Sequence, residues 1–469
     1  MKKRGRLRKG LAMLLTAAMM VGIIPAMSGG ADEVQAATEN GTGNTPSVTA
    51  YATKEQLMTA FAPDSDGNAT NIGKLVFGKD ENGTAQEWYI LGKDEGVSGD
   101  NTIIFAASPI ATNQVFEDDW QSNKTYDSSF GVYTSNPTDV YPNHYGASDL
   151  RVALKNMATS ETYFTSAEQD LMNDTTVTTK DTENSATYTT TDKLYALAAD
   201  GSGSSYKTIK AGTSDSTVLA MDSYWSSGAG FWLRSPYDDY ASSALLAFPG
   251  DIVFDYSVYY GIAVQPASNL NLSSVLFASA ATAASSDTVK SDTIASGKAM
   301  TLRLDGTGKN IGTVTYNTTT GDIKATKGST EGDVALIVQG KGTINGEEKD
   351  WYYSKQITGT EVVNVTDIVS DTNTPSSMDL STCKIWLEIT DTDGLIYAAG
   401  ATEILSITSV EITDIETPAP NTSLDTEALC ATTGVSSTTP QITWTPSDST
   451  AGYNKSYTAS ITLTADTGY

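Results

Sequence analysis

The sequence predicts an α+β first domain followed by all-β sandwich modules of the immunoglobulin-like kind. Capped helical segments are interspersed with short strands over residues 51–280, whereas short strand patterns separated by turn residues fill residues 281–405 without a convincing helix. A last, shorter set of strands occupies residues 406–469. The length of 469 residues is sufficient for about three domains.

Two capping boxes and one stretch of helical spacing predict the helices of the first domain. Residues 53–56 and 165–168 each have the pattern of a capping box, and apolar residues recur every three or four positions over 148–157. Apolar runs bounded by turn residues predict strands at 74–77, 88–91, 102–105, 244–248, 252–254 and 262–264. Short strands mixed with helices indicate an α+β domain.

A run of small and polar residues over 278–286 predicts a domain boundary. Beyond it, Asn345-Gly346 and Asp393-Gly394 stand where hairpins would turn. The expected strands are 301–304, 313–316, 334–339, 351–357, 361–365, 384–389 and 395–398. Seven short strands favour an immunoglobulin-like sandwich over 281–405.

The segment 406–469 has strand patterns at 410–415, 441–444 and 457–463. It is too short to bury a full sandwich and stops within an expected strand. We therefore expect an incomplete β-sandwich repeat and a sequence that is a fragment.

The first 36 residues have the pattern of a secretory signal peptide. A basic stretch precedes an apolar run over 11–24, and small residues before Ala37 fit a cleavage site. The apolar run is too short to span a bilayer. We expect a secreted protein, either extracellular or attached to a cell wall, in which residues 37–50 form a polar linker.

Charge and cysteine content narrow the class of protein. Without residues 1–36 the chain has 23 basic and 54 acidic residues, a formal net charge of −31. Nucleic acid is therefore not an expected partner, since binding phosphates requires a basic face. The cysteines Cys383 and Cys430 fall in different expected modules, which excludes a disulfide scaffold. No other segment is long and apolar enough for a membrane span.

The sequence contains no recognisable catalytic or metal-binding motif, and we expect no enzyme activity and no cofactor. A metal site normally draws on several His or Cys ligands, yet His144 is the single histidine. His144 could act as a general base, but a surface or loop histidine is the favoured interpretation. The acidic stretch 64–67 resembles the start of a calcium loop, but its glycine stands at the wrong position, which favours a plain turn.

Arginine is rare after residue 36: only Arg151, Arg234 and Arg303 occur. A lone arginine among lysines suggests that the planar guanidinium makes several hydrogen bonds at once. In a strand, Trp232 and Arg234 share one face. We expect Trp232, Arg234 and Arg151 to be structural residues, with direct capture of an anionic ligand by Arg234 as the alternative.

The segment 231–236, read with 261–267 and 269–277, resembles an uncharacterised domain family of secreted proteins from anaerobic Gram-positive bacteria, with a Trp-Leu-Arg-Ser-Pro core. The resemblance covers roughly residues 51–280. That family is similar to the C-type-lectin-like fold shared by formylglycine-generating enzymes and by ligand-binding proteins that retroelements diversify. The resemblance implies this fold, although Gln265 stands where the family usually has arginine, and the paired cysteines of formylglycine-generating enzymes are missing.

The later segments resemble modules of bacterial surface proteins. Residues 299–357 are similar to a sandwich domain that often follows the lectin-like domain, and residues 442–463 are similar to a repeat module. This resemblance implies immunoglobulin-like spacers.

Aromatic and acidic residues that follow the Trp-Leu-Arg-Ser-Pro core form the candidate ligand-binding set. Tyrosines supply a large contact area at low entropic cost and stack on sugar or peptide surfaces. The set is Tyr237, Asp238, Asp239, Tyr240, Asp255, Tyr256, Tyr259 and Tyr260. We expect a non-enzymatic recognition or adhesion protein for glycan or protein ligands, with a structural surface-layer or matrix component as the alternative.

Overall fold

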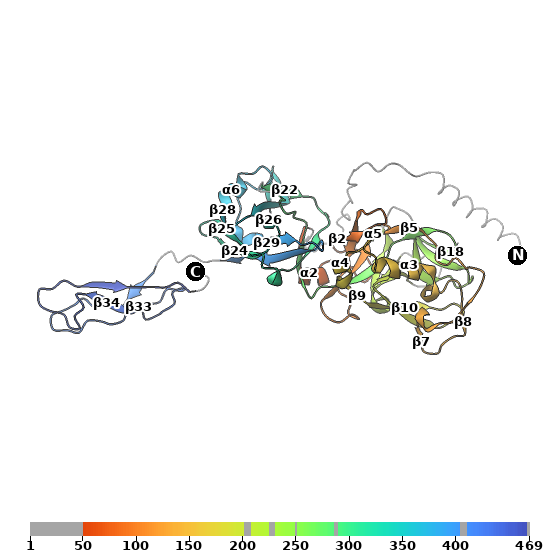
Figure 1. The fold of residues 1–469 in the computed structure, drawn as a ribbon, viewed down its shortest axis with the longest axis horizontal. Coiled ribbons are helices and arrows are strands. Elements are labelled where there is room, and N and C mark those ends of the chain that lie inside the picture. Colours follow the sequence, from red (N-terminus) through yellow and green to blue (C-terminus); the bar gives the residue numbers. More distant parts are fainter. Residues whose placement is uncertain are drawn as a thin grey trace. The chain divides into compact units, whose positions relative to one another are not determined.

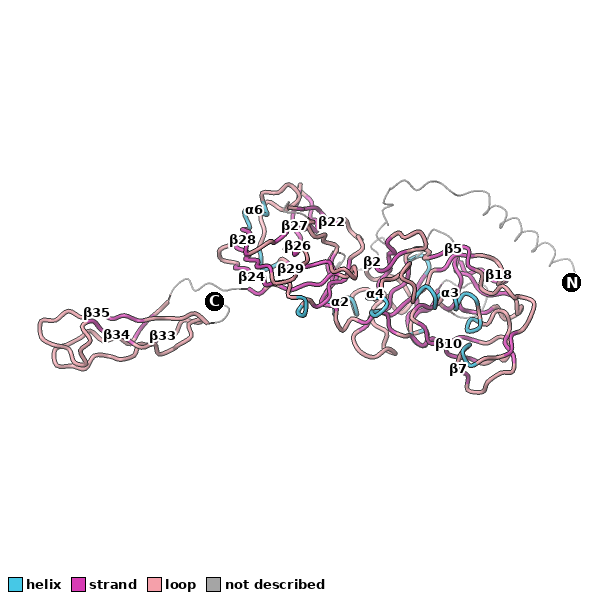
Figure 2. Tube along the Cα trace, in the orientation of Figure 1, coloured by secondary structure: helices cyan, strands magenta, loops and turns pink. Residues whose placement is uncertain are grey.

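The computed structural model describes residues 50–200, 208–224, 230–248, 251–285, 289–403 and 410–466, with the backbone alone for 214, 251–255 and 403. The expected signal peptide and residues 37–49 of the expected linker lie outside the described residues. Strands make up 43% of the structure and helices 12%, and short strands and loops dominate the trace in Figure 2. The prediction of a β-rich chain with several sheets is therefore confirmed.

Two sheets form the centre of the first part. Phe105 in one packs against Phe231 in the other, with ring centroids 5.9 Å apart, inside a buried apolar cluster. The first sheet has the order β12 (Leu194–Tyr195), β20 (Ala267–Asn271), β4 (Asn101–Ala106), β3 (Ala85–Ile90) and β2 (Lys74–Lys79), with β9 (Met172–Asn173) also paired to β20. The second sheet has the order β18 (Asp251–Ser257), β17 (Ser243–Phe248), β16 (Phe231–Pro236), β19 (Ile262–Val264) and β5 (Ala111–Gln114).

Three smaller sheets surround this centre. One has the order β10 (Thr175–Lys180), β11 (Thr187–Asp192) and β7 (Val132–Tyr133), and another has the order β13 (Ala198–Ala199), β14 (Thr208–Ala211) and β15 (Thr217–Ala220). The third pairs β6 (Lys124–Thr125) with β8 (Asp139–Val140).

Side-chain caps begin three helices of the first part. Capping boxes at Thr53 and Thr165 open α2 (Lys54–Thr59) and α4 (Ser166–Leu171), because each threonine accepts from the N3 amide while the N3 side chain accepts in return. Ser148 caps α3 (Asp149–Ala158), a helix of the first part (Figure 1). This helix buries Leu150, Leu154 and Met157. These three helices are found where the sequence predicts them, and α5 (Met221–Tyr224) adds a short fourth.

One sheet joins the first part to the second. Its order is β1 (Tyr51–Thr53), β21 (Val275–Ser279), β23 (Thr301–Asp305), β30 (Ile396–Gly400), β29 (Lys384–Thr390), β26 (Val334–Ile344), β27 (Glu347–Ile357) and β22 (Lys290–Ile294). The boundary expected at residue 280 thus directly follows β21, which is paired with β23 beyond it. Phe277 and Trp386 meet edge to face across this point at 5.1 Å, so residues on both sides share one apolar core.

A four-stranded sheet completes the second part. Its order is β28 (Thr360–Asn364), β25 (Asp322–Lys327), β24 (Gly312–Asn317) and β31 (Thr402–Glu403), and apolar side chains of β24, β25, β26 and β29 form one buried cluster. Where the sequence predicts no helix, α6 (Val365–Val369) follows Asn364. The reason is an Asn364–Asp367 capping box, whose asparagine and aspartate replace the more familiar Ser/Thr and Glu.

The described residues 410–466 contain two antiparallel strand pairs, β32 (Ile412–Thr413) with β33 (Leu429–Cys430) and β34 (Ile442–Thr445) with β35 (Thr458–Ile461). Cys430 is buried here, and Cys383 in the second part is half-buried; both thiols are free.

Candidate functional site

Two turns that carry the predicted ligand-binding residues meet at one end of the β18-β17-β16-β19-β5 sheet. The turn 237–242 follows β16 and the turn 258–261 follows β18. Because β17 is antiparallel to both strands, β16 and β18 run in the same direction, and their C-terminal ends lie at the same end of the sheet. The amide of Val258 donates to the carbonyl of Ser242 over 3.0 Å, which joins the two turns directly.

A third segment joins them from far away in the sequence. The amides of Phe116 and Glu117 both donate to the carbonyl of Val258, over 2.9 and 3.0 Å. This contact places Trp120 beside Tyr259, with ring centroids 5.2 Å apart. The loop 116–120 is therefore fixed to the turn 258–261 through the backbone.

Four rings form a continuous aromatic surface, which we call the aromatic platform: Trp120, Tyr256, Tyr259 and Tyr260. The centroid of Tyr260 lies 4.4 Å from Tyr259 and 5.4 Å from Tyr256. Trp120 and Tyr259 each leave 38% of their surface exposed, while Tyr256 and Tyr260 are half-buried. Large aromatic residues held at the surface are typical of binding sites.

The platform rests on a buried tryptophan. Trp232 is 1% exposed, and its ring meets Tyr256 edge to face at 6.0 Å and Phe116 at 5.5 Å. Its indole N–H donates to the carbonyl of Gln114 over 2.8 Å. The predicted structural residue Trp232 therefore lies under the platform and contacts two of the segments that build it.

The turn 237–242 carries a second aromatic pair. The rings of Tyr237 and Tyr240 stack with centroids 5.9 Å apart, and Tyr240 is 56% exposed. The hydroxyl of Tyr237 donates to Asp239 over 3.1 Å, and Lys180 forms an exposed ion pair with Asp238 at 2.8 Å. The two predicted aspartates thus lie at the surface beside the tyrosine pair.

Asn143 holds the turn 237–242 in place from the protein interior. Its side chain is fully buried, and its amide NH₂ donates to the carbonyls of Tyr237, Tyr240 and Ser243 over 3.3, 3.2 and 3.0 Å. Its backbone amide donates to the carbonyl of Ala241. The turn is held by one side chain that never reaches the surface.

The structure brings seven predicted ligand-binding residues to the two adjoining turns and their flanks. The eighth, Asp255, belongs to β18, and its side chain lies outside the described residues. Sequence reasoning missed Trp120. A signal was present, because Asp118-Asp119-Trp120 repeats the acid-acid-aromatic order of Asp238-Asp239-Tyr240.

Hydrogen bonding and burial perturb the titration of the platform and its support. The hydrogen bond between the Tyr259 and Tyr260 hydroxyls, 3.1 Å long, and partial burial raise the pKa of Tyr260. Burial also raises the pKa of Glu117, against the lowering effect of its ion pair with Lys124. The hydroxyl of Tyr260 therefore stays neutral and can both donate and accept a hydrogen bond.

The three arginines after residue 36 are all buried. Arg234 is fully buried, and its guanidinium donates to the carbonyl of Ala196 over 2.8 Å and to the carboxylate of Asp215, with a longer contact to the carbonyl of Thr178. These protein acceptors occupy the guanidinium from several sides. The arrangement leaves Arg234 no surface for an external anion.

Arg151 ties α3 to its neighbours in the same manner. Its guanidinium donates to Asp192 over 2.8 Å and to the carbonyls of Ser129 and Gly146 over 2.7 and 3.0 Å. Arg151 is 6% exposed. Buried arginines that satisfy carboxylates and carbonyls stabilise a particular packing of segments.

His144 is a loop histidine, but it is buried rather than at the surface, with 2% of its area exposed. Its ring stacks on Tyr188 at 4.0 Å, and its Nδ1 accepts from the amide of Ala147. The proton of the neutral ring is therefore on Nε2, which donates to the hydroxyl of Tyr133 over 2.6 Å; that hydroxyl donates in turn to Asp181 over 2.6 Å. Burial lowers the pKa of His144 to about 4, although Asp181 opposes the effect.

No group of three or more His, Cys, Asp or Glu side chains that could hold a metal ion occurs among the described residues. In the acidic stretch 64–67, the carboxylate of Asp64 accepts from the amides of Asp66 and Asn68 over 3.0 and 2.8 Å. This geometry is that of a turn closed by its own amides.

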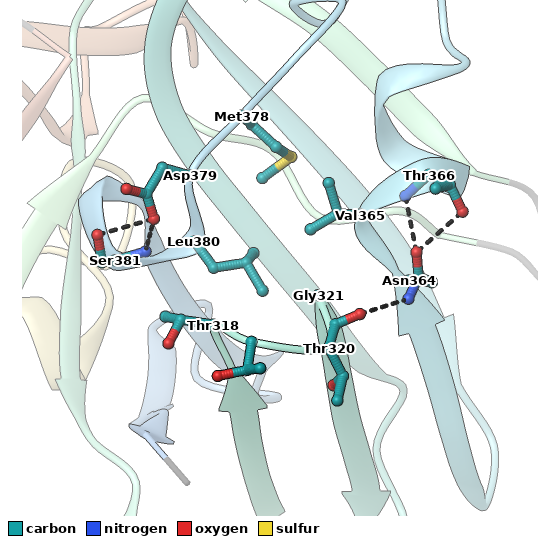
Figure 3. A pocket seen from close by; sticks show the side chains of 11 residues that line it. Thr318, Thr320, Gly321, Asn364, Val365, Thr366, Met378, Asp379, Leu380 and Ser381 are labelled. Atoms are coloured by element: carbon teal, nitrogen blue, oxygen red, sulfur yellow. Dashed lines mark hydrogen bonds between the residues drawn. The ribbon is translucent and has the colours of Figure 1, made fainter. Parts of the chain in front are cut away.

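A hollow of about 650 Å³ lies in the second part, between the turn 318–321, the start of α6 and the 3₁₀ turn Leu380–Thr382 (Figure 3). Its polar side chains bond locally: Asn364 accepts from Thr366, and Asp379 accepts from Ser381. Because these polar groups are engaged with one another rather than aimed into the hollow, the aromatic platform is the stronger candidate site.

Comparison with known proteins adds one finding. Residues 110–272 match the model of a family described as "Domain of unknown function (DUF6273)". No curated protein and no solved structure matches the chain. The matched range contains the whole aromatic platform, the Tyr237–Tyr240 pair, Arg151 and Arg234. In the part of the chain that the structure describes, no helix is long and apolar enough to cross a membrane.

Proposed function

We propose that this protein is a non-enzymatic, secreted recognition or adhesion protein, extracellular or associated with the cell wall, which binds glycan or protein ligands through the aromatic platform. In this proposal the first part is a C-type-lectin-like domain, and the later parts are immunoglobulin-like modules that act as spacers. The signal-peptide pattern supports an extracellular location.

One observation carries the proposal: aromatic rings from two segments that are distant in the sequence form a single, partly exposed surface on a hydrogen-bonded support. Trp120 and Tyr259 are exposed, yet both are linked to the sheet through the Val258 backbone and through Tyr256 over Trp232. A preorganised aromatic surface loses little conformational entropy when a ligand binds, which is the general advantage of a rigid binding site.

The placement of His144 supports binding rather than catalysis. Its ring is buried, and both ring nitrogens bond to protein groups. A general base must reach a substrate proton within hydrogen-bond distance. The hydrogen bonds from His144 through Tyr133 to Asp181 are instead internal contacts of the fold. His144 directly follows Asn143, which holds the turn 237–242.

The test is a binding screen with the whole secreted chain, because the first part shares a sheet and a core with the second. The chain is applied to a glycan array and to a panel of extracellular proteins, alongside the double variant Trp120→Ala/Tyr259→Ala. Tyr453→Ala is the matched control, since Tyr453 is 70% exposed in the last part. We expect specific binding that the double variant loses and the control keeps.

Two outcomes would overturn the proposal. In one, the correctly folded wild-type chain binds nothing on either panel. In the other, the double variant binds as well as wild type. Loss of self-association in the double variant, without any ligand for wild type, would favour a surface-layer or matrix component instead.

A further inference from the structure

The segments that carry the platform and the Tyr237–Tyr240 pair have charged side chains of only one sign. Residues 115–123 and 237–262 include seven aspartates and glutamates and no lysine, arginine or histidine. Asp118, Asp119 and Asp239 are exposed beside the exposed rings. An anionic ligand would meet like charge at this surface.

Two lysines that form ion pairs with these segments do not reverse the sign of their charge. Lys124 pairs with the buried carboxylate of Glu117 and donates to the carbonyl of Ala147. Lys180 pairs with Asp238. Each of these cations is matched by a carboxylate, so Asp118, Asp119 and Asp239 determine the net charge that a ligand encounters.

Aromatic faces and carboxylates favour the same kind of ligand group. The face of a tryptophan or tyrosine ring attracts a cation through its quadrupole, and adjacent carboxylates add a Coulombic attraction. A ligand that has a protonated amine and a flat apolar face therefore interacts favourably with both the rings and the carboxylates. A ligand with phosphate, sulfate or carboxylate groups satisfies only the rings.

Two separate groups of aromatic rings at the surface, which we call aromatic stations, suit a ligand with repeating units. The platform and the Tyr237–Tyr240 pair lie on turns that the Val258–Ser242 hydrogen bond joins. Sugar rings present flat faces at regular intervals, so one oligosaccharide chain can contact both stations. A single amine side chain of a peptide would occupy only one station at a time.

We propose that the ligand is an oligosaccharide of amino sugars with free, protonated amines. This inference rests on the proposed function, and it specifies the ligand class at the same site. The rings stack on the sugar faces, and Asp118, Asp119 and Asp239 bind the ammonium groups and the adjacent hydroxyls.

The experiment measures binding of the whole secreted chain to three tetrasaccharides by calorimetry at pH 5.5, where sugar amines are protonated. The probes are the β-1,4-linked tetramers of glucosamine, of N-acetylglucosamine and of glucose, with tetralysine as a peptide arm. We expect the glucosamine tetramer to bind about tenfold more tightly than its N-acetylated counterpart. The preference should shrink between 50 and 500 mM salt.

Two pairs of variants test which side chains cause the preference for the amine and which bind the sugar rings. Asp119→Asn should lower the preference for the amine several-fold with little effect on the N-acetylated tetramer, whereas Glu331→Gln, an exposed acid in the second part, should change neither. Trp120→Ala should weaken both tetramers, whereas Tyr453→Ala should weaken neither. Circular dichroism of each variant shows whether the fold is retained.

The outcomes separate this inference from the proposed function. Equal or tighter binding of the N-acetylated tetramer overturns the amine preference but leaves a glycan-binding platform. Tighter binding of tetralysine than of the glucosamine tetramer overturns the glycan class and points to a protein partner. Both proposals are overturned if the chain binds none of the sugars, does not bind the peptide, and finds no ligand on the glycan array or the protein panel.

Discussion

The guanidinium Nε of Arg303 lies 2.9 Å from a carboxylate oxygen of Glu388, and both side chains are excluded from solvent. Arg303 also donates to the carbonyls of Ser279 and Ala281, both over 2.8 Å. Glu388 accepts in addition from the indole N–H of Trp386. One ion pair therefore connects β23 and β29 with the chain that leaves β21, at the point where the two expected domains meet.

Removal of the Glu388 charge should destabilise both parts together. Glu388→Gln leaves a buried guanidinium without its counter-charge, a change that costs about 3 to 5 kcal/mol in other proteins. Urea denaturation followed by tryptophan fluorescence measures the effect. Glu347→Gln breaks an exposed pair with Lys349 and should leave the midpoint unchanged. Separate unfolding of the two parts in the Glu388 variant would contradict a shared core.

Replacement of Arg234 by lysine should destabilise the first part although it keeps the charge. A lysine ammonium cannot reach Ala196, Asp215 and Thr178 at once, because it lacks the planar fork. We expect a loss of about 3 kcal/mol in the free energy of unfolding. Lys180→Arg, an exchange at an exposed pair, is the matched control. Equal stability of Arg234→Lys and wild type would show that the charge alone matters.

Stability should depend on His144 in mildly acidic solution. The folded state holds the pKa of His144 at about 4, below the ordinary value near 6.5, so the unfolded chain takes up the proton first. The contribution of neutral His144 is fully present above pH 6.5, and up to about 3 kcal/mol is lost as the pH falls to 4.

The charged groups around the His144 ring shift its pKa in opposite directions. Asp181, reached through Tyr133, favours the protonated form, whereas Arg151 and Lys124 disfavour it. The measurement compares the urea midpoints of wild type and His144→Gln at pH 7.5, 5.5 and 4.5, so that the other carboxylates cancel in the difference. The difference between the two proteins should narrow as the pH falls; parallel curves would rule out the histidine as the source.

Asn143→Asp should loosen the turn 237–242 without altering the surface. The substitution replaces two N–H donors with oxygen, which then faces the carbonyls of Tyr237, Tyr240 and Ser243. Buried polar groups without partners cost about 1 to 3 kcal/mol. Hydrogen exchange should report faster exchange of the Val258 amide, which bonds to Ser242. Ligand affinity should fall as well, although Asn143 is fully buried; unchanged exchange and affinity would show that the turn is held by other contacts.

The sequence alone predicted elements whose causes are local. Capping boxes at Thr53 and Thr165 specify their helices because the cap and the N3 residue are three positions apart. Hairpins and strands follow from side-chain alternation and turn residues, as at Asn345-Gly346 between β26 and β27. Even the missed helix α6 has a local cause, the capping box of Asn364.

Only the tertiary structure showed which distant segments meet. Trp120 lies beside Tyr259 because the amides of Phe116 and Glu117, in the loop of Trp120, donate to the carbonyl of Val258. Neither segment contains a sequence signal for the other. The continuation of one sheet across residue 280 likewise depends on the register of β21 against β23. Composition identified the rare arginines, but their partners come from other elements, because a buried charge is matched by whichever carboxylates and carbonyls the fold brings within reach.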